Sequence, residues 1–157
     1  MDIQLFRIDD RLIHGQVVLG WATALNSDSI ILCDDSVSKN DWEKELYLSC
    51  VPEYLKTRIL SVDETHEVLN GNQNLSNTII LANGPEIVEK LVDKGLTLNK
   101  VNIGGIHFRD GRKSFLPYLY LDEEEVKTFL RCMEKGVVFE CQDVPTGSKV
   151  NLKNLLT

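Results

Sequence analysis

The sequence predicts an α/β protein whose mainly parallel sheet of about six or seven strands is covered by helices on both faces. Short apolar runs alternate with longer amphipathic stretches along the chain, as in proteins built from strand-helix-strand units. Helix start and stop signals bound the amphipathic stretches. With 157 residues, of which 43% are hydrophobic, the chain can bury one core but is too short to argue for two domains. We therefore expect a single domain over residues 1–157.

Strands are predicted where apolar residues run together between turn signals. A further extended segment is expected at "YLYL" (118–121), and "NGNQNLSN" (70–77) is expected to be a polar surface loop. The six predicted strands are 3–8, 29–34, 57–62, 78–82, 100–104 and 137–141.

Helices are predicted in the amphipathic stretches between the strands. Ser61 and Glu64 fit a capping box, and Asp122 precedes an acidic first turn, which the helix dipole favours. Gly95 and Gly136 follow helical stretches, as C-terminal caps do. The five helices are expected at about 14–25, 38–51, 63–70, 84–94 and 122–135.

Charge and composition exclude several classes of protein. A formal net charge of -7 without a basic stripe argues against nucleic-acid binding. The four cysteines show no metal-ligand spacing and are expected to be buried, reduced thiols. No apolar run approaches the roughly 20 residues that cross a bilayer, and no signal peptide is evident. We expect a cytoplasmic protein that begins at Met1.

The stretch "RIDDRLIHGQVV" places unusual charge where the first strand ends and the first helix begins. Ligands collect at the carboxyl ends of parallel strands, where helix N-termini present unpaired N–H groups. If the helix begins near His14, Gly15 permits close backbone approach, and the amides of Gly15, Gln16 and Val17 can bind an anion.

The same stretch contains the groups that phosphoryl transfer requires. A turn could bring the guanidiniums of Arg7 and Arg11 round the His14 imidazole to grip a phosphate. Asp9 or Asp10 could accept a hydrogen bond from one ring nitrogen and leave the other as a nucleophile. The alternative interpretation is a solvated, salt-bridged turn at a helix start.

The run "RIDDRLIHGQV" resembles the active-site signature of the IIB components of the mannose/fructose/sorbose family of the bacterial phosphoenolpyruvate-dependent sugar phosphotransferase system. The resemblance continues through "CDDSVSKND", "SCVPE", "NIGG" and "GVVFECQDVP", so it covers essentially the whole chain. It implies a three-layer α/β/α fold. It also implies that a histidine in the first loop, here His14, is phosphorylated on Nδ1 by the phosphohistidine of a IIA partner.

The resemblance assigns roles to other residues of the motif. Arg11 is similar to the arginine that steadies the phosphoryl group, whereas Arg7, Asp9 and Asp10 are expected to shape the loop. The "NIGG" turn resembles a family segment beside that loop, in which glycines allow close backbone approach; its candidate site residues are Asn102, Gly104 and Gly105.

The resemblance also implies partners and a reaction. Members of the family pass the phosphoryl group to a sugar as the membrane components IIC and IID translocate it. We therefore expect a phosphohistidine-sugar phosphotransferase, recruited to the membrane by IIC and IID, with no cofactor and no metal. A homodimer is plausible, and the sugar is expected to be of the mannose, fructose, sorbose or amino-sugar class.

The sequence departs from the family pattern in two places. Asp34 and Asp35 stand where members commonly have Asn-Asp, and Glu53 stands where they usually have glycine. If the two aspartates point inward, they add negative charge near the site. These departures bear on the sugar or the partner more than on the chemistry.

Other polar and aromatic residues have ordinary interpretations beside functional ones. His66 and His107 show no metal-ligand spacing, but a contact between His107 and the active loop is possible. "HFRDGRK" gathers Arg109, Arg112 and Lys113 either in a solvated turn, which we favour, or in a partner-binding patch. Trp21 is expected to pack in the core, and Trp42 to be more exposed.

Two other functions remain open from the sequence. A regulatory or interaction module of the same fold would be phosphorylated without feeding a transporter. A small-molecule-binding domain would instead hold a free anion at the first helix, with no covalent adduct.

Overall fold

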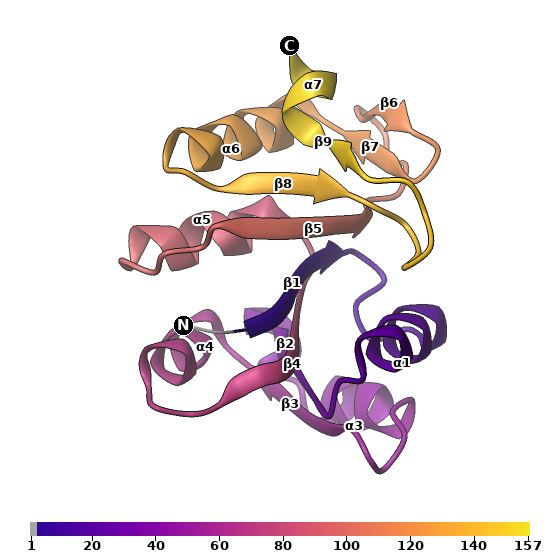
Figure 1. Ribbon diagram of the computed structural model, residues 1–157, viewed down its shortest axis with the longest axis vertical. Coiled ribbons are helices and arrows are strands. Elements are labelled where there is room, and N and C mark those ends of the chain that lie inside the picture. Colours follow the sequence, from indigo (N-terminus) through magenta and orange to yellow (C-terminus); the bar gives the residue numbers. More distant parts are fainter. Residues whose placement is uncertain (1–2) are drawn as a thin grey trace.

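A computed structural model describes residues 3–157, apart from the side chains of residues 16–18. In this part of the chain seven strands form one sheet in the order β3-β2-β4-β1-β5-β8-β9 (Figure 1). All neighbouring pairs are parallel except the last, β8 with β9. The strands are β1 (Ile3–Asp9), β2 (Ser29–Cys33), β3 (Lys56–Leu60), β4 (Leu75–Ala82), β5 (Lys100–Gly105), β8 (Val138–Cys141) and β9 (Val150–Asn151).

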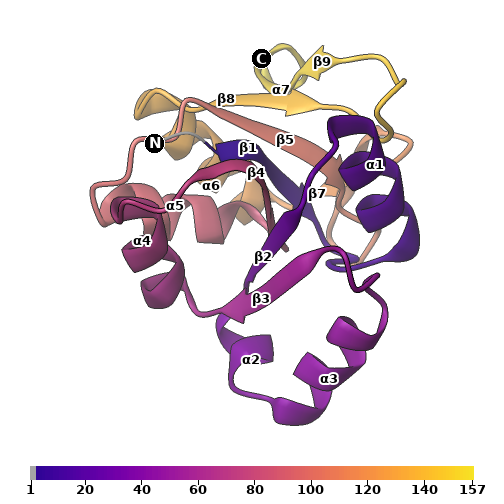
Figure 2. The same cartoon turned by 60° about the horizontal axis from the view of Figure 1, so that its bottom comes forward.

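Helices cover both faces of this sheet. One face carries η1, α1, α2 and α3, and the other carries α4, α5 and α6 (Figure 2). The helices are η1 (Gln16–Trp21), α1 (Ala22–Leu25), α2 (Asp35–Ser38), α3 (Asp41–Ser49), α4 (Val62–Asn70), α5 (Pro85–Asp93), α6 (Glu123–Glu134) and α7 (Leu152–Leu156). The three-layer α/β/α fold with a mainly parallel sheet is confirmed.

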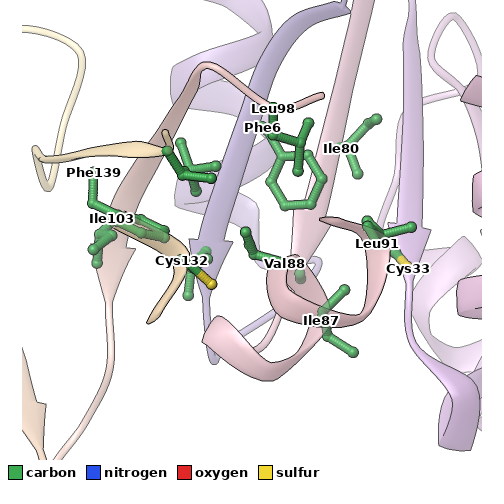
Figure 3. Close-up of a cluster of buried hydrophobic side chains, with 14 of the residues drawn as sticks. Phe6, Cys33, Ile80, Ile87, Val88, Leu91, Leu98, Ile103, Cys132 and Phe139 are labelled. Atoms are coloured by element: carbon green, nitrogen blue, oxygen red, sulfur yellow. The ribbon is translucent and has the colours of Figure 1, made fainter. Parts of the chain in front are cut away.

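Two apolar clusters fill the spaces between the sheet and its helices. In the first, Phe6 and Ile80 of the central strands face Val88 and Leu91 of α5 (Figure 3). The second lies under η1 and α3 and includes Trp21, which is 5% exposed. The predicted core position of Trp21 is therefore confirmed, and Trp42 is exposed as expected.

The helices begin and end where local signals in the sequence predict. Ser61 and Glu64 form both halves of a capping box at the start of α4, and Asp122 forms a second one at the start of α6. Gly95 and Gly136 follow α5 and α6 with φ of +95° and +94°, a left-handed conformation that favours glycine. These caps explain why the boundaries of α4, α5 and α6 agree closely with the predicted ones.

The helix predicted over residues 38–51 is confirmed as α3 (Asp41–Ser49), and a short helix that was not predicted, α2 (Asp35–Ser38), precedes it. Asp34 caps α2 by accepting a hydrogen bond from the backbone N–H of Val37. Asn40 then adopts an extended conformation and caps α3 through the N–H of Glu43. The N-cap at Asn40 therefore sets the start of α3 at Asp41, three residues later than predicted.

The C-terminal third of the chain also differs from the prediction. The extended segment predicted at 118–121 is confirmed as β7 (Leu119–Leu121), but its partner β6 (Lys113–Leu116), with which it forms a separate antiparallel hairpin, was not predicted. Neither β6, β9 nor α7 was predicted, because each is too short to show a periodic pattern.

The polar loop at 70–77 is shorter than expected, since β4 begins at Leu75.

Candidate active site

The loop after β1, residues 10–15, turns apolar side chains inward and polar ones outward. Leu12 and Ile13 are buried in the second cluster, at 6% and 4% exposure, whereas His14 is exposed and the Arg11 side chain is 34% exposed. Leu12 has a φ of +58°, which costs a non-glycine residue about 1–2 kcal/mol. Burial of its side chain offsets that cost, and the loop leaves the His14 side chain exposed and the Arg11 side chain partly exposed.

The chain enters a helix after His14, which confirms the helix predicted at about 14–25, but the first part of this helix is not an α-helix. The first six residues, Gln16–Trp21, form a π-helix, and α1 continues it for four. Short π segments occur frequently at functional sites. The side chain of Gln16 lies outside the described part of the structure, so its role stays a prediction. No atom lies within 4 Å of the position that a Cβ would take at Gly15.

Asp9, the last residue of β1, is fully buried and holds Arg11. Its Oδ1 accepts hydrogen bonds from Arg11 N at 3.1 Å and Nε at 3.0 Å, and its Oδ2 accepts one from Nη2 at 2.9 Å. The side-chain hydrogen bond to Asp9 is the main cause that raises the pKa of Arg11. Nη1 of Arg11 has no hydrogen-bond partner among the described residues. Arg11 is therefore a cation that the buried Asp9 holds in place.

Arg7 lies beneath the loop and connects three segments of the chain. Its Nη1 donates to Asn102 Oδ1 on β5 and, at 2.9 Å, to the carbonyl of Gln142. Its Nη2 donates to the carbonyl of Asp143 at 2.8 Å and lies 3.5 Å from Asp9 Oδ2. Arg7 thus joins the carboxyl ends of β1 and β5 to the segment that follows β8.

This burial corrects one expectation about the loop. The Arg7 side chain is 0% exposed and its guanidinium lies 4.5 Å from the ring centroid of Trp21. Burial lowers its pKa to about 10, although the nearby Asp9 charge opposes the shift. The two guanidiniums therefore do not surround the His14 imidazole together: Arg11 reaches the surface, and Arg7 is an internal support.

Asp10 binds a residue 97 positions away in the sequence. Its Oδ1 accepts from His107 Nδ1 at 2.5 Å, and its Oδ2 accepts from the His107 backbone N–H at 2.8 Å. The possible contact between His107 and the active loop is confirmed. The oxygens of Asp9 and Asp10 bond to Arg11, Arg7 and His107, and the expectation that one of these carboxylates orients His14 stays a prediction.

The basic turn at residues 107–113 divides into buried and exposed parts. Arg112 is 8% exposed and forms a forked ion pair with Glu125 of α6, at 2.8 Å and 2.7 Å. It also donates to the His107 carbonyl at 2.7 Å. The turn is closed at Gly111, with φ of +90°, as its sequence predicts. Arg109 and Lys113 are exposed, but Arg112 belongs neither to a solvated surface nor to a partner patch.

The "NIGG" segment lies beside the loop, as expected. Asn102 is 3% exposed and is paired with Arg7 in the sheet register. A Cβ at Gly104 would overlap the Arg7 guanidinium, whereas one at Gly105 would make ordinary contacts, the nearest at 3.6 Å from Asp9 Oδ1. Glycine is therefore required at position 104, where the backbone lies against the Arg7 side chain.

These elements surround a cleft of about 230 Å³ beside the loop. Burial raises the pKa of Tyr118 at this cleft to about 12, so its hydroxyl keeps its proton at neutral pH. The sequence pointed to neither Tyr118 nor the Asp143 backbone, although Asp143 stands in the quoted "ECQDVP". The cleft is lined by Arg11, Gly104, Gly105, His107, Tyr118, Asp143 and Val144.

Comparison with known proteins decides the family. The model of one family, described as the PTS system sorbose subfamily IIB component, matches residues 3–157. The chain belongs to this family of phosphotransferase-system IIB components. The resemblance found in "RIDDRLIHGQV" is thereby confirmed.

The named relatives are components of the same phosphotransferase system. The chain is 36% identical over 148 residues to the sorbose-specific EIIB component of Lacticaseibacillus casei, covering 93% of this chain and 90% of the relative. It is 31% identical over 158 residues to the mannose-specific EIIAB component of Escherichia coli K12, and spans only 49% of that longer protein. The crystal structure of the IIBSor domain of the Klebsiella pneumoniae sorbose permease superposes with a TM-score of 0.90 at 30% identity, covering 99% of this chain and 96% of that one.

The departures from the family pattern have structural explanations for two of the three residues. Asp34 is buried as the N-cap of α2, and Asp35 Oδ1 accepts from the backbone N–H of Val62 at 2.9 Å. Both are thus engaged at helix starts, with β4 between their strand and β1. Glu53 is exposed in a turn, and nothing in the structure explains it.

Among the described side chains, no group of three or more His, Cys, Asp or Glu residues could hold a metal ion. Among the helices described, none is both long and apolar enough to cross a membrane.

Proposed function

We propose that this chain is a phosphohistidine carrier, which accepts a phosphoryl group on His14 from a IIA protein and passes it to a sugar during uptake. The observation that supports this most directly is the loop geometry. The loop exposes His14 three residues after Arg11, whose guanidinium the buried Asp9 holds in place. Membership of the IIB family supports the same reaction class.

In the first step, a ring nitrogen of His14 attacks the phosphorus atom of the IIA phosphohistidine. The new N–P bond forms as the donor N–P bond breaks, and the donor imidazole keeps the electron pair of that bond. The attacking nitrogen must carry a lone pair, and the family resemblance assigns it as Nδ1. Arg11 would stabilise the charge on the equatorial phosphoryl oxygens through Nη1, since such transfers depend mainly on positioning and electrostatics.

In the second step, a sugar hydroxyl oxygen attacks the phosphorus on His14. The O–P bond forms, the His14 N–P bond breaks, and the released imidazole takes up the proton that the hydroxyl loses. We propose that the membrane components IIC and IID present the sugar at this point. The names of the relatives support the mannose, sorbose, fructose or N-acetylgalactosamine class of substrate.

The mannose-specific EIIAB relative supports a IIA partner, because its printed name combines both components in one protein. The exposed surface round the loop would receive the IIA phosphohistidine. Neither the individual sugar nor a homodimer follows from this geometry.

The experiment is phosphorylation with phosphoenolpyruvate, the general phosphotransferase proteins and a IIA protein, followed by intact mass and peptide mapping. We expect one acid-labile, alkali-stable phosphate on His14. His14→Ala should take up no phosphate while it remains folded, and Arg11→Ala should load at least about tenfold more slowly, because it loses a charge-assisted contact.

His66→Ala is the matched control, because His66 lies on α4 and its Nε2 lies 3.0 Å from Asn70 Nδ2 on the same helix. It should load like the wild type. The proposal is wrong if His14→Ala accepts phosphate at an unchanged rate. Addition of membranes that contain IIC and IID then tests whether the phosphate reaches a sugar.

A further inference from the structure

We propose that His107 is a second ligand of the phosphoryl group, which binds its oxygens through Nε2 alongside Arg11. This inference rests on the proposed phosphorylation of His14 and adds a residue that the first-loop motif does not contain.

The first observation is the way in which Asp10 orients the His107 ring. One carboxylate oxygen accepts from Nδ1 and the other from the backbone N–H of the same residue. A ring whose Nδ1 is held in this way directs Nε2 away from Asp10. In the imidazolium form both nitrogens donate, so Nε2–H is available to an acceptor while Nδ1–H stays on Asp10.

The second observation is that the His107 ring lies at the same cleft as Arg11. Gly105 lies between the Asp9–Arg11 pair and the Asp10–His107 pair. A Cβ at Gly105 would be 3.6 Å from Asp9 Oδ1 and 3.8 Å from His107 Cε1. Asp9 in turn holds Arg11. The edge of the ring that carries Cε1 therefore faces the Asp9–Arg11 pair across a glycine, and Nε2 is the nitrogen next to Cε1 on the side away from Asp10.

The third observation is that the His107 backbone is anchored, although its side chain is 56% exposed. Arg112 donates to the His107 carbonyl and is itself fixed by two hydrogen bonds to Glu125 of α6. Ile106, the preceding residue, is buried and pairs through its backbone with Tyr118 and Tyr120. The backbone at His107 is therefore held in place, while more than half of the His107 side-chain surface stays open to solvent.

The carboxylates of the active loop have basic partners. Asp9 lies between Arg7 and Arg11, and Asp10 bonds to His107 and lies 4.0 Å from Arg112, which also pairs with Glu125. The carboxylate of Asp143, which also lines the cleft, accepts from the backbone N–H of Val144 at 2.9 Å.

The test separates direct contact with phosphate from a role in holding the loop. His107→Asn keeps a donor near Nδ1 for Asp10 but has none near Nε2, and His107→Gln does the reverse. We expect His107→Asn and His107→Ala to load phosphate from phosphorylated IIA about 10- to 100-fold more slowly than the wild type. His107→Gln should retain more of the rate than either. His66→Asn, the matched control, should be unchanged.

The outcomes distinguish the alternatives. If His107→Asn loads at the wild-type rate and His107→Gln does not, His107 only clamps Asp10 and the proposal is wrong. Equal, wild-type rates in all three variants would overturn it as well. If the proposed function itself fails, the wild type carries no phosphate on His14, and the inference falls with it.

A second measurement needs no variant and so does not depend on how the variants fold. In protein labelled with ¹⁵N, we expect the Nε2 signal of His107 to shift on phosphorylation of His14, and that of His66 to stay in place. An unchanged His107 signal in fully phosphorylated protein would contradict a direct contact.

Discussion

The guanidinium of Arg7 occupies the space that a side chain on residue 104 would need. A carbon attached at Gly104 would lie 1.9 Å from Arg7 Nη2 and 2.1 Å from Cζ, far inside van der Waals contact. The glycine therefore lets a buried arginine run across the end of β5 and bond to the segment after β8. This packing connects the strand that precedes the active loop to the rest of the carboxyl edge of the sheet.

Gly104→Ala should consequently destabilise the protein. Arg7 cannot yield without breaking buried hydrogen bonds, so we expect the free energy of unfolding to fall by at least about 3 kcal/mol. Urea unfolding measures this change. Gly105→Ala is the matched control and should change stability by less than about 1 kcal/mol, because its Cβ would make only ordinary contacts. Equal losses in the two variants would show that Arg7 does not impose the requirement.

Asp9→Asn should impair both stability and phosphate loading. The substitution removes the counter-charge of Arg7 and Arg11 while it keeps the shape of the side chain, and removing one partner of a buried ion pair costs about 3–5 kcal/mol. Arg11 also loses its forked hydrogen bonds, so loading from IIA should slow. The exposed Asp28→Asn serves as a control for the lost charge. An Asp9→Asn protein with wild-type stability and rate would refute the role assigned to Asp9.

Arg112→Lys should weaken the turn that carries His107. Lysine cannot reproduce the forked pair with Glu125 or donate at the same time to the His107 carbonyl, so we expect a loss of about 1–3 kcal/mol in the free energy of unfolding. Arg109→Lys, on the same turn but exposed, should have no measurable effect. Were the turn only a solvated basic surface, both variants would behave like the wild type.

Thiol reactivity should single out one cysteine. Burial raises the pKa of Cys33 and Cys132 to about 11 and that of Cys141 to about 12, so all three stay protonated and shielded at pH 8. Cys50 is exposed after α3, which corrects the expectation that all four thiols are buried. A chromogenic disulfide should therefore titrate one thiol in the native protein and four in urea.

Cys50→Ser should abolish the native reaction and leave three thiols in urea. Rapid modification of a second thiol in the folded variant would contradict the burial of the other cysteines.

Much of the fold follows from local chemistry in the sequence. Apolar runs predicted the core strands, and capping residues such as Ser61 and Gly95 predicted helix ends, because these signals act within a few residues. The same locality explains the failures. The elements α2, with four residues, and β9, with two, are too short for any period to appear.

The candidate site divides in the same way. A long, charge-specific motif in the first loop was enough to single out His14 and Arg11. The sequence did not indicate that Arg7 is buried, because an arginine four residues before Arg11 looks equally suited to grip a ligand. Only its neighbours at Asn102 and Gln142, which other strands bring to the same edge, show that it faces inward.

By itself, then, the sequence determined the α/β class, most element boundaries and the loop in which phosphate chemistry is expected. Tertiary structure alone decided which charges serve that chemistry and which support it. Asp10 meets His107 across 97 residues because β1 and β5 are neighbours in the sheet, a pairing that no local pattern encodes. Burial then separates Arg7 from Arg11, since a charge removed from water must be bonded internally, whereas one at the surface can bind a ligand.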